Sequence, residues 1–362
     1  MDLKVYTLGE LEPHLFTLYS NPETILPVSP LRMRSYLENP RASSSDPVLF
    51  EIRQDGEVVA FRSLLPDIFF DREGNPHRFA WLSGNWVEPG LRRQGISTRL
   101  LELAEERWEG QLMYTNYAPE SKAVYDRTGR FRVIADREGK RFYLRSDAET
   151  LLSKRLGFKK LFRASDRVIN QRHERSLESY LPSLKVDCEL EQVQGILAQL
   201  AKLVNRHQQQ SLFRRDREIF EWALQYPWVT EQDCDPINYQ FSYKASRFEN
   251  IIYHVVHPEG DTHGILWMLI HNNSLSVPYQ FSGNAALHKC MADTIVRTMI
   301  ENGCTYTTIR YPELTARLMA HQKAFLSVRN MPQLIFAHEK LASLIPEGSL
   351  IHDGDGDVMF TG

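Results

Sequence analysis

With 362 residues, the chain is too long for one typical domain, and two domains of similar size are the simplest expectation. Its 42% hydrophobic and 25% charged residues describe a globular protein, and the net charge of −3 argues against broad electrostatic binding to nucleic acid or anionic membrane. No apolar run reaches the length of a membrane span, and the N-terminus lacks a signal-peptide pattern. We therefore expect a soluble, cytoplasmic protein. Its four cysteines form no CxxC pair, so we expect free thiols.

The first half of the chain alternates predicted strands and helices. The expected elements are a helix at 29–40, a hairpin at 47–70, a strand at 79–87, a helix at 97–108, a strand at 112–118, a helix at 120–129 and a final hairpin at 131–145. The hairpin at 47–70 turns at Asp55-Gly56. Strands that give way to strand–helix–strand order predict a mixed sheet with a parallel crossover in its middle.

The second half repeats this order of elements. The stretch at 148–184 is basic and only partly periodic, and we interpret it as a linker with helical ends. Beyond it, the tripeptide Ser83-Gly84-Asn85 recurs as Ser282-Gly283-Asn284, again at the end of a predicted strand. We therefore expect an internal duplication, with domains at 1–147 and 185–362.

The connection after the strand at 79–87 combines glycine with arginine. The first amides of a helix have no partner within the helix and carry partial positive charge, and glycine lets a ligand approach the backbone closely. Arg92 and Arg93 add positive charge beside Gly95 and the small Ser97. The spacing is neither a dinucleotide-binding GxGxxG pattern nor a Walker loop. It predicts a pyrophosphate held in a different way.

This segment resembles the acyl-CoA-binding motif of the GNAT superfamily of N-acyltransferases, which reads Arg/Gln-x-x-Gly-x-Gly/Ala after a valine and a proline. The residues that match are Val87, Pro89, Arg92, Gln94, Gly95 and Ile96, and Ser97 replaces the last glycine. The resemblance covers about residues 1–145 by motif and the remainder by element order. It implies two GNAT-like α+β domains, each with a mixed, mostly antiparallel sheet that is splayed at a central parallel pair and flanked by helices.

The resemblance also implies which residues hold acetyl-CoA, the expected cosubstrate. Backbone amides around Trp86 and Val87 would polarise the thioester carbonyl. The other residues expected to contact acetyl-CoA are Arg92, Arg93, Gln94, Gly95, Ile96, Ser97, Asn116 and Ser121. The CoA loop would occupy one side of the splayed sheet, so the amine would enter from the other side.

A second family motif, Asn-x-x-Ala-x-x-x-Tyr-x-x-x-Gly-Phe, is partly present. Tyr125 and Gly129 fit it, Ser121 replaces the alanine, and Asn116 lies two residues before the expected asparagine. By resemblance, Tyr125 would be the general acid that protonates the CoA thiolate. The alternative is that Tyr125 only packs a helix against the sheet.

Two acidic features have less specific interpretations. Glu88 is the nearest candidate for the base, although it could equally be a solvated loop residue, and His77 is a weaker candidate. Asp353, Asp355 and Asp357 alternate near the C-terminus but lack the glutamate of an EF-hand, so we expect a turn there and no metal.

Together these features predict an N-acetyltransferase that moves an acetyl group directly from acetyl-CoA to a primary amine of a small-molecule or peptide acceptor. The first 187 residues contain no cysteine, which fits direct attack. The second half has no arginine–glycine pattern and is not expected to bind CoA. Two alternatives remain: a tRNA-dependent aminoacyl transferase of the peptidoglycan-bridge type, and a non-catalytic CoA-sensing module.

Overall fold

The chain folds into two units that are interleaved in sequence. The computed structural model describes residues 1–21, 23–115, 119–150, 152, 157–196, 198–233, 237–259 and 262–361. The first unit comprises Met1–Asp136, Gln208–Ala245 and Gln333–Thr361, and the second comprises Arg137–His207 and Ser246–Pro332. The expected boundaries, 1–147 and 185–362, differ from these units because two segments of the second half belong to the first unit.

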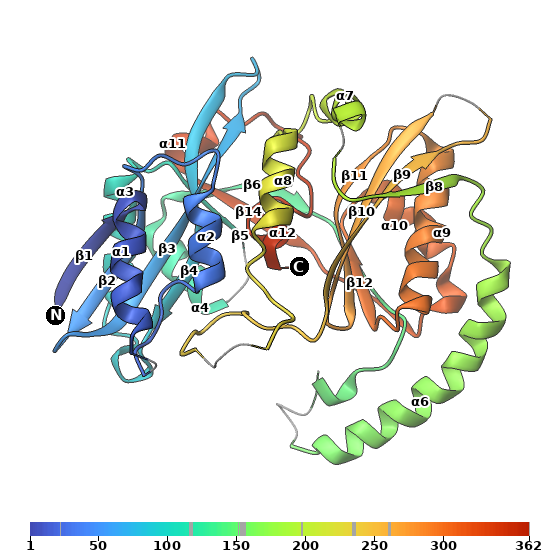
Figure 1. Cartoon of the computed structure of the whole chain (residues 1–362), viewed down its shortest axis with the longest axis horizontal. Helices are drawn as coiled ribbons and strands as arrows, with labels where there is room; N and C mark the ends of the chain where they lie inside the picture. The colour runs from blue at the N-terminus through green and yellow to red at the C-terminus, as the bar shows by residue number, and fades with distance from the viewer. Residues whose placement is uncertain are drawn as a thin grey trace. The chain divides into compact units, whose positions relative to one another are not determined.

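The first unit is built on one seven-stranded sheet flanked by helices (Figure 1). In spatial order its strands are β1 (Asp2–Thr7), β2 (Pro47–Gln54), β3 (Glu57–Phe70), β4 (Pro76–Val87), β5 (Leu112–Thr115), β14 (Gln333–His338) and β6 (Phe131–Arg137). Its helices are α1 (Leu8–Tyr19), α2 (Pro30–Leu37), α3 (Ile96–Arg107), α4 (Pro119–Thr128), α8 (Arg217–Gln225), α11 (Glu339–Ala342) and α12 (Val358–Thr361), with a 3₁₀ turn, η1, at Pro89–Leu91.

Local sequence explains where the helices near the site begin. Ser29 caps α2, since its hydroxyl accepts a hydrogen bond from the Arg32 amide at 3.2 Å, and Pro30 stands in the first turn, where a missing N–H costs nothing. Helix α3 buries Leu100 and Leu101 completely against the sheet, as its apolar spacing predicts.

The sheet of the first unit is splayed at a parallel pair. Strands β4 and β5 are parallel, and among the described residues only Ala80 and Trp81 of β4 have partners on β5, although β4 continues to Val87. On its other edge β4 pairs antiparallel with β3, with a register shift beside Gly84. A Cβ on Gly84 would lie 2.3 Å from the Ser63 hydroxyl oxygen, so a larger residue at this shift would force that hydroxyl, which accepts from Arg32, to move. The last part of β4 therefore borders a gap rather than a paired strand.

The second unit repeats this arrangement around its own seven-stranded sheet. In spatial order the strands are β13 (Ser327–Asn330), β7 (Lys140–Tyr143), β12 (Tyr306–Ile309), β11 (Ser274–Phe281), β10 (His263–His271), β9 (Phe248–Val256) and β8 (Glu189–Val193). Strands β11 and β12 form the parallel pair. The helices are α6 (Lys159–Tyr180), α7 (Ala198–His207), α9 (Ala285–Glu301) and α10 (Pro312–Met319), with 3₁₀ turns η2 (Leu181–Ser183) and η3 (Gln322–Ala324). The predicted fold class, two mixed sheets each splayed at a parallel pair, is confirmed.

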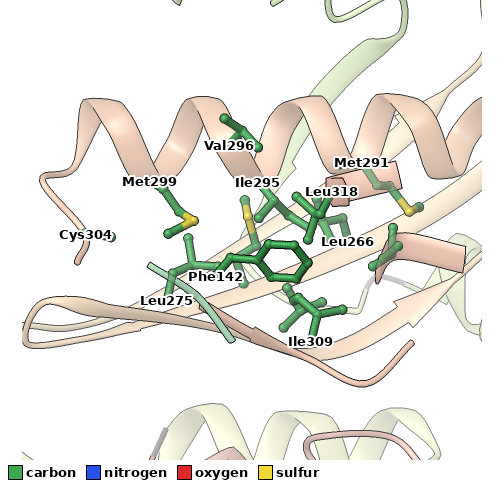
Figure 2. Packing of buried hydrophobic residues seen from close by; sticks show 14 of the residues in the cluster. Phe142, Leu266, Leu275, Met291, Ile295, Val296, Met299, Cys304, Ile309 and Leu318 are labelled. Carbon is green, nitrogen blue, oxygen red and sulfur yellow. The ribbon is translucent and has the colours of Figure 1, made fainter. Parts of the chain in front are cut away.

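Helix α9 supplies much of the core of the second unit. Met291, Ile295 and Met299 point from α9 toward Leu266 and Ile309 on the strands below (Figure 2). These five side chains are fully buried, so the second sheet has an apolar core of its own. In the segment expected to be a linker, α6 is one continuous helix from Lys159 to Tyr180 rather than a loop with helical ends.

The predicted hairpin at 131–145 is wrong. Strand β6 lies at the edge of the first sheet beside β14, whereas β7 lies in the second sheet between β12 and β13. Likewise β13 and β14, which follow one another closely in sequence, belong to different sheets. Pairing with distant strands therefore replaces the local pairing that the sequence pattern favours. No helix in the described part of the chain is long and apolar enough to cross a membrane.

Candidate functional site

The connection between β4 and α3 presents unpaired amides. Arg93 and Gly95 have left-handed backbone, with φ of 66° and 79°. Gly95 caps α3, and its carbonyl accepts the Arg99 amide at 3.0 Å, so the first amides of α3 have no partner within the helix. No atom lies within 4 Å of a Cβ built on Gly95, so its positive φ, and not crowding, selects glycine there. This concave set of N–H groups suits an anion.

These amides border a cavity of about 660 Å³ in the first unit. That volume lies in the range of small-molecule and cofactor sites. Of the residues expected to hold acetyl-CoA, those that line the cavity are Trp86, Val87, Arg92, Arg93, Gly95, Ile96 and Ser97. The lining residues that were not predicted are Asn85, Leu91, Thr98, Ala123, Val124 and Arg127.

The two arginines of the loop have different environments. The Nε of Arg92 donates a hydrogen bond to the Val87 carbonyl at 3.0 Å and so ties the loop to the end of β4. Arg93 is exposed and, among the described residues, forms no hydrogen bond or ion pair, which leaves its guanidinium available to a phosphate. Gln94 donates to the Gly90 carbonyl at 3.4 Å and does not line the cavity.

Backbone alternation directs one amide into the gap beside β4. The Glu88 amide donates to the Val59 carbonyl of β3 at 2.9 Å. Because successive amides of a strand point to opposite sides, the Val87 amide faces away from β3, toward the gap. The Glu88 side chain is exposed and does not line this cavity, so its role as the base stays a prediction. His77 pairs with Asp71 at 2.7 Å.

A buried arginine that the sequence analysis missed connects the cavity wall to Tyr125. Arg62 of β3 is 1% exposed, and its Nη1 donates to the Tyr125 hydroxyl at 3.0 Å. Its Nη2 donates to the Asn85 amide oxygen at 3.2 Å, and the Ser97 hydroxyl donates to the same oxygen at 3.2 Å. The network thus joins β3, β4, α3 and α4 where the sheet is splayed. A lone arginine inside an apolar strand was the signal that could have indicated it.

Tyr125 is held by aromatic packing as well as by Arg62. Its ring lies 3.9 Å from that of Tyr114, centroid to centroid, and Tyr114 in turn stacks on Phe336 at 4.6 Å. Burial raises the pKa of Tyr114 above its ordinary value. Tyr125 itself is buried, its hydroxyl accepts from a guanidinium, and it donates to no other group among the described residues.

Two expected contacts cannot be placed. Asn116 lies outside the described residues. Ser121 lies in α4, but its side chain is also outside them. Both therefore stay predictions.

The family model described as the acetyltransferase (GNAT) family matches residues 14–129. This span contains the β4–α3 junction, the cavity and Tyr125. Residues 14–129 are a GNAT domain. Such a domain transfers acyl groups from acyl-CoA, so the chain is an acyltransferase. No curated protein matches the sequence.

Solved structures share the GNAT fold over almost the whole chain. A GCN5-related N-acetyltransferase from Kribbella flavida is 15% identical, with a TM-score of 0.51 over 94% of this chain and 72% of that one. Saccharomyces cerevisiae N-myristoyltransferase with bound myristoyl-CoA is 13% identical, with a TM-score of 0.52 over 99% of this chain and 83% of that one. A probable N-acyltransferase from Enterococcus faecalis is 10% identical, with a TM-score of 0.50 over 94% of this chain and 73% of that one. At these identities the likeness establishes the fold alone.

The first unit contains a second cavity, of about 390 Å³, for which the sequence contains no signal. It shares β4 with the first cavity, since Ser83 lines the second while Asn85 lines the first. Its charged lining residues are Arg32 and Asp357, and its aromatic ones are Trp228, Tyr239 and Phe241.

Of the three C-terminal aspartates, Asp355 is held by an ion pair. Asp355 accepts from Arg215 at 3.1 Å, and Arg215 also binds Asp67 through both terminal nitrogens, at 2.7 and 2.9 Å. Burial alone would raise the pKa of Asp67, but Arg215 and Arg41 bring it below its ordinary value. Within the described residues, no group of His, Cys, Asp and Glu side chains could hold a metal ion.

Proposed function

We propose that the chain transfers an acetyl group from acetyl-CoA directly to a primary amine of an acceptor. One observation supports this proposal most strongly. Gly95, with its left-handed backbone, and the unpaired amides at the N-terminus of α3 both border the cavity of about 660 Å³, which Arg92 and Arg93 also line. The family whose model matches the GNAT domain is described as one of acetyltransferases, which favours acetyl as the acyl group.

In this proposal the amides of Ile96 and Ser97 and the free guanidinium of Arg93 bind the pyrophosphate of acetyl-CoA. The Val87 amide, which faces the gap beside β4, donates to the thioester oxygen. Such a donor strengthens its bond as negative charge develops on that oxygen, and one well-placed donor is worth about 3 kcal/mol to the transition state.

The chemical step forms one bond and breaks another. The amine nitrogen bonds to the acetyl carbon, the carbon–sulfur bond breaks, and Tyr125 donates its proton to the departing thiolate. Arg62 lies 3.0 Å from the phenol oxygen and stabilises the phenolate that remains. The proton that the amine loses passes to water or to Glu88, which is the predicted base.

The test measures turnover of the purified chain with acetyl-CoA and a panel of amino acids, polyamines, amino sugars and peptides. A thiol reagent detects released CoA, and mass spectrometry detects the N-acetylated product. We expect product with at least one amine, and faster turnover with acetyl-CoA than with myristoyl-CoA. Binding of acetyl-CoA without any product would instead favour a CoA sensor, and acyl transfer only from aminoacyl-tRNA would favour the peptidoglycan-bridge type.

A further inference from the structure

The second cavity contains a buried cation that the proposed mechanism does not use. Arg32 is 2% exposed and donates to the Tyr36 hydroxyl through Nη2 and Nε, at 2.7 and 3.1 Å. Its Nη2 also donates to the Ser63 hydroxyl at 3.1 Å, and its Nη1 to the Tyr239 hydroxyl at 3.4 Å. Every one of these acceptors is neutral. Among the described residues, no carboxylate pairs with Arg32.

A buried guanidinium without a counter-ion is costly. Burial of an unpaired charge costs several kcal/mol, and hydrogen bonds to neutral hydroxyls recover only part of it. The Trp228 ring lies 4.2 Å from the guanidinium carbon, and this cation–π contact recovers about 2 kcal/mol, again only part of the cost. An anionic ligand in the cavity would supply the missing charge. The Nη1 of Arg32, with the longest of the four bonds, is the donor that can most readily turn to it.

The same cavity also contains a carboxylate without a cation. One oxygen of Asp357 accepts the Ser83 hydroxyl at 2.8 Å, and no ion pair to Asp357 exists among the described residues. Asp357 is half-buried, and like Arg32 it lines the cavity. Two opposite charges that do not pair with each other therefore share a cavity of about 390 Å³. A small molecule that carries both an amine and a carboxylate complements both.

The cavity shares strand β4 with the proposed reacting centre. Ser83 lies two residues before Asn85, which lines the first cavity, on the part of β4 that borders the gap. The Nη1 of Arg32 lies 3.5 Å from the position that a Cβ on Gly84 would take. A ligand held between Arg32 and Asp357 therefore lies along the strand whose Val87 amide is proposed to bind the thioester oxygen.

We propose that the acetyl acceptor is a free amino acid, whose carboxylate binds Arg32 and whose ammonium binds Asp357; this inference rests on the proposed acetyl transfer. The walls of Trp228, Tyr239 and Phe241 favour an apolar or aromatic side chain. The ammonium loses two protons as the amide bond forms. The first leaves to water through Asp357, which frees the neutral amine for attack. The second passes to water or to Glu88 as the amide bond forms, and Tyr125, which gave its proton to the CoA thiolate, regains one from water, so one proton is released in net terms. A polyamine would place a second cation near Arg32, and an amino sugar would leave Arg32 unpaired.

The experiment compares each amino acid with its own carboxamide, which retains the amine and side chain but lacks the carboxylate. The wild-type chain is assayed with acetyl-CoA, and kcat/KM is calculated per protonated amine, the form that is proposed to bind Asp357, because the two amines differ in pKa. The best amino acid, expected to be apolar or aromatic, should exceed its carboxamide by roughly 10- to 150-fold, the range for hydrogen bonds to a charged group.

Substitutions on α2 separate the role of Arg32 from a general effect of lost charge. In Arg32→Met the preference for the acid over the carboxamide should fall toward one. Arg34→Met removes an exposed arginine from the same helix and should keep the wild-type preference. If Arg32→Met does not fold by circular dichroism, Tyr239→Phe tests the same end of the cavity, and we expect the preference to change there too.

Three results would overturn the inference. Carboxamides, polyamines or amino sugars that react as well as amino acids would remove the carboxylate from recognition while leaving the proposed acetyl transfer standing. An unchanged preference in folded Arg32→Met and Tyr239→Phe variants would remove Arg32 from it. The absence of turnover with every amine, despite acetyl-CoA binding by calorimetry, would contradict the acetyl transfer itself.

Discussion

Replacement of Gly95 by valine should abolish tight binding of acetyl-CoA while the fold survives. Gly95 has a φ of 79°, and a Cβ at this position would meet no atom within 4 Å. The valine would therefore introduce backbone strain but no steric clash in the protein without bound acetyl-CoA. Its side chain would instead extend beside the unpaired amides of α3, where the pyrophosphate is proposed to lie.

The backbone strain and the loss of pyrophosphate contacts differ in free energy. A non-glycine residue held in left-handed backbone costs about 1–3 kcal/mol, which for a unit of this size lowers Tm by about 2–12 °C. Displacement of the pyrophosphate removes charge-assisted hydrogen bonds worth about 1.5–3 kcal/mol each. The loss of two of them would raise the Kd roughly 10²- to 10⁴-fold.

Calorimetry with acetyl-CoA measures the affinity, and thermal unfolding by circular dichroism measures the strain. Gly56→Val is the matched control, because Gly56 has a φ of 89°, has open space around its Cβ position, and lies in the turn between β2 and β3. It should lower Tm to a similar degree and keep the wild-type Kd. If Gly95→Val bound acetyl-CoA as tightly as Gly56→Val, the pyrophosphate would not lie at the start of α3.

Three further predictions concern other parts of the first unit. Tyr125→Phe should lower kcat roughly ten- to a thousandfold with little change in the Kd of acetyl-CoA, and an unaltered rate of a rate-limiting chemical step would exclude it as the acid. Arg93→Ala should raise that Kd roughly two- to fivefold, an effect that calorimetry should find smaller at high salt. Asp67→Asn removes the negative charge that faces Arg215 and Arg41. It should lower the free energy of unfolding, measured in urea at pH 7, by about 3–5 kcal/mol. Because the folded pKa of Asp67 is lowered, its contribution is complete above its unfolded pKa of about 3.9 and is lost as the pH falls further, so the wild type and the variant should converge in acid. A difference that stayed constant below pH 4 would contradict that assignment.

Features that depend on neighbours in the sequence could be predicted. The junction from β4 to α3 follows from an apolar strand, a glycine with its arginines and an amphipathic helix within about thirty residues, and the structure places most of the expected residues around one cavity. The register shift at Gly84 also has a local signal, since glycine inside a strand commonly marks a bulge or a close contact.

Features that depend on distant pairing could not be predicted. Residues 131–145 have the pattern of a hairpin, yet β6 and β7 pair with strands of two different sheets. The same holds for the charged groups. Arg32 meets Tyr239 across 207 positions of sequence, and Ser83 meets Asp357 across 274. The second cavity therefore has no local signature, and the aspartates near the C-terminus could be recognised only as a turn.

A crystal structure of the chain with bound CoA tests the central claim most directly. The account predicts the pyrophosphate within hydrogen-bond distance of the Ile96 and Ser97 amides, the Arg93 guanidinium beside it, and the CoA sulfur close to the Tyr125 hydroxyl in the gap along β4. CoA bound elsewhere, or a sulfur remote from both the Val87 amide and Tyr125, would contradict it.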